Sequence, residues 1–216
     1  MQREKCKVKS EENRRTCAPA LLRTCAPLML VLLAACGLLL VNCATVAPYH
    51  FTNFTTDLDA LAGMRQKQVA VLSFGDQSGD WQTSGNAMAD EFSLQLGKVG
   101  RFDIVERTRV TDLFREQDFD PQRLDPSSAA HIGNMLGAHG VIMGTITHYR
   151  PGKVGLSVKL VIVETGRIAW QASDVLSGHD ERVQALVSDQ EDRERLITSP
   201  EYLGQMLCRL MAETMK

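Results

Sequence analysis

The sequence predicts an α/β domain with a mixed β-sheet, in which a parallel crossover unit and an antiparallel meander are flanked by helices. Three patterns predict it: an apolar strand, a helix and a second strand over residues 68–106, three strand patterns separated by tight turns over 140–176, and amphipathic helices after each group. The chain has 216 residues, of which 44% are hydrophobic and 23% charged, as expected of a folded globule.

The crossover unit begins with the β-branched, apolar run Gln68–Phe74, which predicts a buried strand followed by a turn over Asp76–Asp80. Thr83 or Ser84 is the expected N-cap of a helix that Gly97 and Gly100 end. Its apolar face comprises Met88, Ala89, Phe92 and Leu96. Phe102–Glu106 is the second strand, and a strand–helix–strand unit of this length favours parallel pairing.

Two helices separate this unit from the meander. Thr108 opens the first, whose apolar positions recur at helical spacing, and Asp120-Pro121 ends it. Asp125 is the N-cap of the second, with Pro126 in its first turn and Gly137 as its C-terminal cap.

The meander comprises the strands Gly140–Tyr149, Val154–Val163 and Ile168–Leu176. Tight turns at Arg150–Lys153 and Glu164–Arg167 join them. The tail is expected to be helical, with a short apolar face over residues 183–187 and a final helix that opens at Ser199-Pro200.

Charge is unevenly distributed along the chain. Residues 1–43 hold 7 basic and 3 acidic residues, and the remainder holds 17 basic and 23 acidic residues. A basic start ahead of an acidic body is a targeting pattern, and it argues against a nucleic-acid partner, which would need a basic patch on the folded part.

The amino-terminal segment has the order of a secretory signal peptide, with basic residues before an apolar run from Ala26 to Val41. At 16 residues the run is shorter than the roughly 20 that span a bilayer as a helix. Leu33-Ala34-Ala35-Cys36-Gly37 resembles the bacterial lipobox, in which the Cys thiol receives a diacylglyceryl group and a peptidase cuts before it. Cys43 is the alternative, although Asn42 fits the small-residue position poorly, and an uncleaved apolar anchor is the third possibility.

These features divide the chain into a lipoprotein signal peptide over 1–35, a lipidated Cys with a flexible linker over 36–66, and an α/β domain over 67–216 with C-terminal helices. Neither Gly37 nor Ala44, the residues after the two candidate cysteines, is the Asp that resembles an inner-membrane retention signal. We therefore expect a lipid-anchored, palmitate-bearing protein of the outer membrane that faces the periplasm. Five of the six cysteines lie in the first 43 residues, so a disulfide framework is rejected, and Cys208 is expected to be a small buried residue.

No motif in the chain predicts catalysis, a metal or a cofactor. A phosphate-binding loop, a Gly-x-Ser-x-Gly elbow and a His-Glu-x-x-His pair are all missing from the sequence, and the five histidines share no ligand spacing. The expected role is therefore a non-enzymatic interaction or assembly module.

Several blocks of the body resemble the soluble domain of the CsgG family, the curli secretion component. They are Val69–Phe74, Gly100–Arg107, Leu113–Gln117, Ala130–Ala138, Val141–Thr147 and Val161–Trp170. The resemblance implies an outer-membrane lipoprotein. Related folds occur in LpoB-type activators of peptidoglycan synthases and in the amino-terminal domain of TolB, so the fold alone does not decide the function.

The resemblance leaves three roles open: a tethered module that binds an envelope protein, a subunit of a CsgG-like secretion complex for curli-type fibres, and an LpoB-like activator. The pore-forming relative is expected to carry two hairpin insertions, which correspond here to Arg150–Lys153 and Gly178–Ser199. The first is only a turn and the second is charged and helical in pattern, so a pore is not expected from this chain alone. A homo-oligomer is also possible.

Two surfaces are candidates for the partner. The first surrounds Glu106, Arg107, Arg109 and Arg115 at the start of a helix, and the second is the charged stretch Asp189–Arg195. In the simpler interpretation both are ordinary solvated faces, because charge runs usually mean no more than that.

Overall fold

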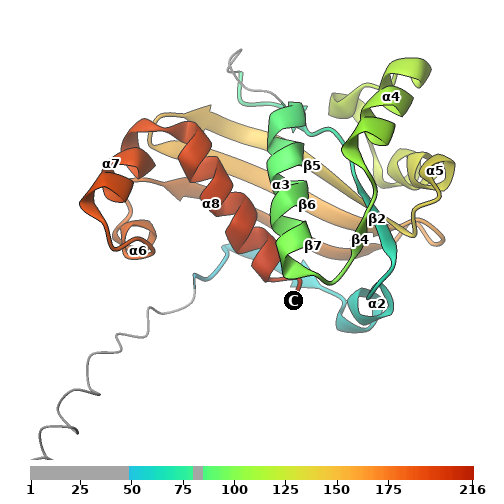
Figure 1. Cartoon of the computed structure of the whole chain (residues 1–216), viewed down its shortest axis with the longest axis horizontal. Helices are drawn as coiled ribbons and strands as arrows, with labels where there is room; N and C mark the ends of the chain where they lie inside the picture. Colours follow the sequence, from blue (N-terminus) through green and yellow to red (C-terminus); the bar gives the residue numbers. More distant parts are fainter. Residues whose placement is uncertain (1–48, 80–84) are drawn as a thin grey trace, which may run out of the picture. The chain divides into compact units, whose positions relative to one another are not determined.

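The structure is a computed structural model that describes residues 49–79 and 85–216. The predicted signal peptide and both candidate lipidation sites, Cys36 and Cys43, lie outside the described residues, as does the expected helix cap at Thr83 or Ser84. The predicted fold class is confirmed: a mixed sheet of seven strands has helices on both faces (Figure 1).

The strands are β1 (Asn53–Thr56), β2 (Gln68–Val71), β3 (Gly75–Asp76), β4 (Asp103–Ile104), β5 (Gly140–Arg150), β6 (Lys153–Ile162) and β7 (Ile168–Ser177). The helices are α2 (Leu58–Gly63), α3 (Gly85–Val99), α4 (Arg107–Gln117), the 3-10 helix η1 (Pro121–Arg123), α5 (Pro126–Leu136), α6 (Glu181–Gln184), α7 (Gln190–Thr198) and α8 (Pro200–Glu213). Across the sheet the order is β1-β7-β6-β5-β2-β4, with β3 paired to β5.

The parallel half of the sheet is the expected crossover unit. β2 pairs in parallel with both β4 and β5, and α3 connects β2 to β4. The strand expected over residues 68–74 is shorter than predicted and resumes as β3, which pairs with Thr145 and Ile146 of β5 where a turn was expected. The helix α3 ends at Gly100, as predicted, whose φ of 69° suits glycine, and Gly97 lies within its last turn.

The antiparallel half is the predicted meander. β5, β6 and β7 are long antiparallel strands, and the register shifts once in each pair, between Ile146 and His148 in β5–β6 and between Leu160 and Val161 in β6–β7. The turn between β6 and β7 contains Gly166 at a φ of 66°, a left-handed conformation that favours glycine.

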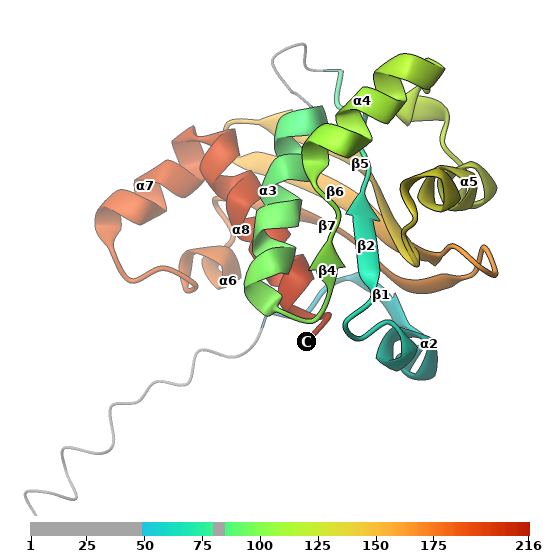
Figure 2. The ribbon, with the colours of Figure 1, turned by 45° about the vertical axis from the view of Figure 1, so that its right-hand side comes forward.

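One face of the sheet is covered by α3 and α8, which pack side by side (Figure 2). Phe92, Leu156, Trp170, Leu203 and other apolar side chains fill this core. Cys208 is fully buried here, as predicted, and Trp170 donates its indole hydrogen to Thr214 Oγ1 at 3.0 Å.

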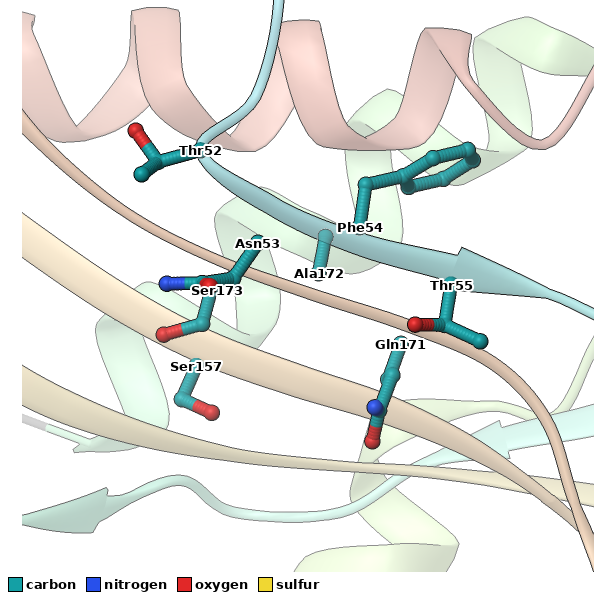
Figure 3. A pocket seen from close by; sticks show the side chains of 8 residues that line it. All are labelled: Thr52, Asn53, Phe54, Thr55, Ser157, Gln171, Ala172 and Ser173. Atoms are coloured by element: carbon teal, nitrogen blue, oxygen red, sulfur yellow. The ribbon is translucent and has the colours of Figure 1, made fainter.

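The opposite face is covered only in part. α4 and α5 pack on β2 and on the start of β5, where Leu72, Val110, Ile132 and Val141 make a second, smaller core. The side of β1, β6 and β7 that points away from α8 carries polar side chains (Figure 3). The two faces of the sheet therefore differ in polarity.

The predicted caps at Asp125, Gly137 and Ser199 are confirmed, whereas α4 begins at Arg107, after Glu106, and not at Thr108 as expected. Asp125 accepts a hydrogen bond from Ser128 N at 2.7 Å, and Ser199 Oγ accepts one from Tyr202 N at 3.1 Å. Gly137 ends α5 in the left-handed conformation. Such caps involve residues three positions apart, so local sequence is sufficient to predict them.

The expected linker over 36–66 is wrong in its second half. β1 pairs with β7 and α2 packs against β7, so residues 53–63 belong to the domain, which begins before residue 67. These elements are short, and they are stabilised by the sheet edge rather than by a strong local pattern. Only the chain upstream of Tyr49 remains as a candidate tether.

Candidate functional site

The helix surface expected to bind a partner is only partly available. Arg107 turns inward: its Nε lies 2.6 Å from Asp90 Oδ1, its Nη1 donates to the carbonyl oxygen of Val71 at 2.5 Å, and its Nη2 donates to Asn86 Oδ1 at 3.3 Å. Only 15% of its side chain is exposed. Arg107 therefore fastens α3 and α4 to the end of β2 and is poorly placed for a partner.

The other three residues of that surface are exposed. Glu106 precedes α4 and makes no side-chain cap bond, Arg109 donates to the carbonyl oxygen of Leu136 at 3.4 Å, and Arg115 pairs with Asp112 one turn earlier. Pairs of this exposed kind contribute little to stability.

The second expected surface, Asp189–Arg195, corresponds to the start of α7. Asp189 caps the helix by accepting from Glu191 N at 3.2 Å, and Asp192 lies 3.4 Å from Arg195. The Arg195 guanidinium also stacks 4.3 Å from the centre of the Tyr202 ring on α8. Part of this charge therefore stabilises the packing of α7 on α8.

A polar hollow of about 410 Å³ lies on the uncovered face of the sheet (Figure 3). Its side chains include Asn53, Thr55, Ser157, Gln171 and Ser173, which point to the same side of β1, β6 and β7. The register explains the arrangement, because Asn53 faces Ser173 and Thr55 faces Gln171 across the β1–β7 pair. All are uncharged, so the hollow can donate and accept hydrogen bonds but offers no acid, base or nucleophile of unusual reactivity.

A larger cleft of about 650 Å³ lies between α2, the end of α5 and the β6–β7 turn. Met64, Ala138 and Val163 form an apolar floor, and Asp59 and Glu164 stand at the rim. The volume falls in the range of small-ligand pockets, and Asp59, Lys67, His139 and Glu164 are the titratable side chains among the residues that line it.

Near the opposite end of the sheet, the chain enters the domain through a clasp. Tyr49 Oη donates to Asp174 Oδ2 at 3.1 Å, and Thr52 donates to the same carboxylate from its backbone N and from its Oγ1, each at 3.3 Å. Asp174 is 9% exposed, and Phe51 packs edge-on against Tyr49 with ring centres 5.4 Å apart. Burial and the neighbouring Asp174 carboxylate raise the pKa of Tyr49 well above its usual range, so its hydroxyl stays a donor at neutral pH.

The β5–β6 turn lies at this same end and is basic. Arg150 and Lys153 flank it, and no ion pair joins either to an acidic side chain in the described part of the chain. Burial, Lys153 and Arg150 together lower the pKa of His148, which is therefore neutral at pH 7.

Neither a metal centre nor a reactive thiol emerges from the described residues. Within 49–79 and 85–216, no three His, Cys, Asp or Glu side chains are grouped so that they could hold a metal ion. Burial raises the pKa of the Cys208 thiol, whose sulfur lies 3.6 Å from Met88 Sδ, so it is a packing residue. Over the same ranges, no helix is long and apolar enough to cross a membrane.

The class of protein defined by these features is an α/β domain with a mixed sheet, helices on both faces and polar surface hollows. Residues 56–155 match the family model described as curli production assembly/transport component CsgG. The resemblance to the CsgG family seen in the sequence is therefore confirmed over these residues.

Solved structures with a similar fold include the lipoprotein GNA1162 from Neisseria meningitidis, with 16% identity over 57% of this chain and 86% of that chain and a TM-score of 0.46. The LpoB C-terminal domain from Escherichia coli has 20% identity over 55% of this chain and 93% of that one, with a TM-score of 0.42. The PelC dodecamer from Paraburkholderia phytofirmans has 15% identity over 75% and 92%, with a TM-score of 0.41. No curated protein sequence matches the chain. Likeness at this level carries no information on function.

The clasp was not expected from the sequence. The flexible linker predicted over 36–66 includes Tyr49 and Phe51, although two aromatic side chains so close together are unusual for a solvated spacer. The aromatic pair was the available signal. Its partner, Asp174, carries no comparable sequence signal, because it is one polar residue in an otherwise ordinary strand.

Proposed function

We propose that the protein is a lipid-anchored envelope protein whose CsgG-family domain acts as a non-enzymatic interaction module. The match to the CsgG family over residues 56–155 is the observation that carries the proposal. The lipobox-like sequence at Cys36 supports the anchor, with Cys43 as the alternative. The anchor places the domain at the outer membrane, facing the periplasm, and its partner is an envelope protein.

The clasp supports a tethered arrangement, because it fixes where the tether meets the domain. The chain that leads to the anchor therefore leaves the domain from the end of the sheet at which Asp174 lies. A long flexible linker would instead leave the domain free to rotate.

Metabolic labelling with an alkyne analogue of palmitate tests the anchor. We expect labelling of the wild type, loss of labelling in Cys36→Ser and retention in Cys43→Ser. Loss only in Cys43→Ser would move the site to Cys43. Unchanged labelling of the double variant would contradict lipidation at either residue.

Crosslinking in intact cells, followed by identification of the captured proteins, tests the partner. Capture of a peptidoglycan synthase would support the activator role. Capture of secretion components would support the second candidate, a subunit of a fibre-secretion complex, which is favoured by the description of the matched family. The control is the double reversal Arg109→Glu/Arg115→Glu, which should remove the crosslinks only if the α4 surface is the contact.

A further inference from the structure

We propose that the β5–β6 hairpin end of the domain faces the membrane and that its basic tip, Arg150 and Lys153, contacts phospholipid headgroup phosphates. The inference rests on the proposed lipid anchor and adds an orientation and a second, electrostatic membrane contact. It follows from the sheet register, from the clasp and from the charges at the tip.

The register places the tether and the tip at the same end. β1 is antiparallel to β7, with Asn53 opposite Ser173, so the chain upstream of Asn53 continues toward Ser177. Ser177 is opposite Lys153, the first residue of β6. The Gly178 N–H also donates to the carbonyl oxygen of Gly152 at 3.0 Å, which fastens the hairpin turn to the end of β7.

The clasp brings the tether close to the tip. Asp174, which holds Tyr49 and Thr52, is three residues from Ser177 along β7, or about 10 Å at the usual rise of a strand. A fully extended chain spans at most about 3.5 Å per residue, so the five residues between Cys43 and Tyr49 reach about 20 Å. The twelve residues between Cys36 and Tyr49 reach about 45 Å. The short span from Cys43 keeps this end next to the bilayer surface, whereas the longer span from Cys36 lets either end reach it, so that the charge of the tip then sets the orientation.

The charge of the tip suits an anionic surface. Arg150 is exposed, Lys153 is half-buried, and neither forms an ion pair within residues 49–79 and 85–216. Each basic residue near an anionic membrane contributes about 1 kcal/mol, which is roughly a fivefold shift in a binding equilibrium. Two such residues are a weak membrane site alone but an effective orienting contact for a chain that is already anchored.

Acidic residues at the same end limit the contact to the hairpin. Asp180 lies 2.6 Å from Arg182 and Asp192 lies 3.4 Å from Arg195, so these two acids are neutralised locally. Other acids near this end are Glu181, Asp189, Glu191, Glu194 and Glu201 on the helices, and Asp76 on β3. The acids of α6, α7 and α8 lie in the helix layer on one side of the sheet (Figure 1), where Leu196 and Ile197 of α7 approach Gly178 and the turn at Gly152.

The test measures the depth of two fluorescent labels on the full-length lipidated protein. Cysteines are introduced at Pro151 in the tip and at Thr165 in the β6–β7 turn, which the ten residues of β6 hold about 33 Å apart. Cys208 is fully buried and does not compete for the label, and whichever candidate cysteine carries no lipid is replaced by serine. The protein is reconstituted into phosphatidylcholine vesicles with or without phosphatidylglycerol, and a nitroxide-headgroup lipid serves as quencher.

We expect the label at 151 to be quenched at least twofold more than the label at 165, and the difference to grow with phosphatidylglycerol. Arg150→Glu/Lys153→Glu should remove that growth. The matched control is Arg65→Glu/Lys67→Glu, an equal charge change on exposed residues at the other end of the sheet, and it should have no effect. Because no variant alters a buried residue, all should fold.

The possible failures are distinguishable. Protein that floats with both kinds of vesicle but shows equal quenching at the two labels would overturn the orientation and leave the anchor intact. Quenching at 151 that does not respond to phosphatidylglycerol or to the charge reversal would overturn the headgroup contact. Protein that floats with neither vesicle would overturn the anchor, and the inference with it.

Discussion

Tyr49 donates its hydroxyl hydrogen to Asp174, a residue 125 positions further along the chain, at 3.1 Å. The bond joins the segment that enters the domain to its last strand. Because of this bond, the segment around Tyr49 packs on the domain, and the fold determines where the tether leaves it. Four predictions test this clasp and other tertiary contacts.

The clasp should stabilise the domain measurably. Asp174→Asn replaces one acceptor oxygen by an NH2 group, which must then face two of the donors that now bind the carboxylate, so we expect the free energy of unfolding to fall by roughly 2 kcal/mol. Urea denaturation measures the change. Thermolysin should cleave before residue 53 faster in the variant. The control, Asp103→Asn, changes an exposed carboxyl group and should stay within about 0.5 kcal/mol.

The clasp should also weaken at high pH. Burial and Asp174 raise the pKa of Tyr49 in the folded state above its value in the unfolded chain. The folded state therefore holds the proton more tightly, and stability falls as the pH rises above about 10, the unfolded value. The difference in unfolding free energy between the wild type and Tyr49→Phe should narrow over this range, because lysine titration is common to both. A constant difference up to pH 11.5 would show that Tyr49 does not ionise with the expected linkage.

Arg107 should matter for stability more than for binding. Arg107→Met removes three hydrogen bonds and leaves acceptors around Val71 unpaired, so a loss of roughly 2–3 kcal/mol is expected in urea denaturation. Arg107→Lys should recover only part of this loss, because an ammonium group cannot reach all three acceptors. Arg115→Met, on the exposed side of the same helix, should cost less than about 0.5 kcal/mol, and an equal loss in both variants would contradict the inward network.

Two glycines should respond in opposite directions to alanine. A Cβ at Gly178 would lie 2.1 Å from the backbone oxygen of Leu196, so Gly178→Ala should destabilise the fold by about 2 kcal/mol or more. A Cβ at Gly97 meets nothing within 4 Å, and alanine is the better helix former, so Gly97→Ala should stabilise α3 by about 1 kcal/mol. Melting temperatures of the two variants should move apart, and a rise for Gly178→Ala would contradict the close approach of α7 to the end of β7.

The sequence by itself determined the features that depend on near neighbours. The meander of β5, β6 and β7 follows from apolar strand patterns separated by turn residues such as Gly166. The caps at Asp125 and Ser199 follow from contacts three residues away. The order of strand, helix and strand over residues 68–106 was sufficient to predict parallel pairing, because few other connections are sterically favourable.

The tertiary structure alone decided features whose partners are distant in the chain. β3 is two residues long and exists because β5 offers it hydrogen bonds, and β1 is a strand because β7 has a free edge. Arg107 has the same local sequence whether it faces solvent or the interior, and only the positions of Asp90 and Asn86 turn it inward. Local propensity carries no information on such pairings, since their free energy comes from residues that the fold brings together.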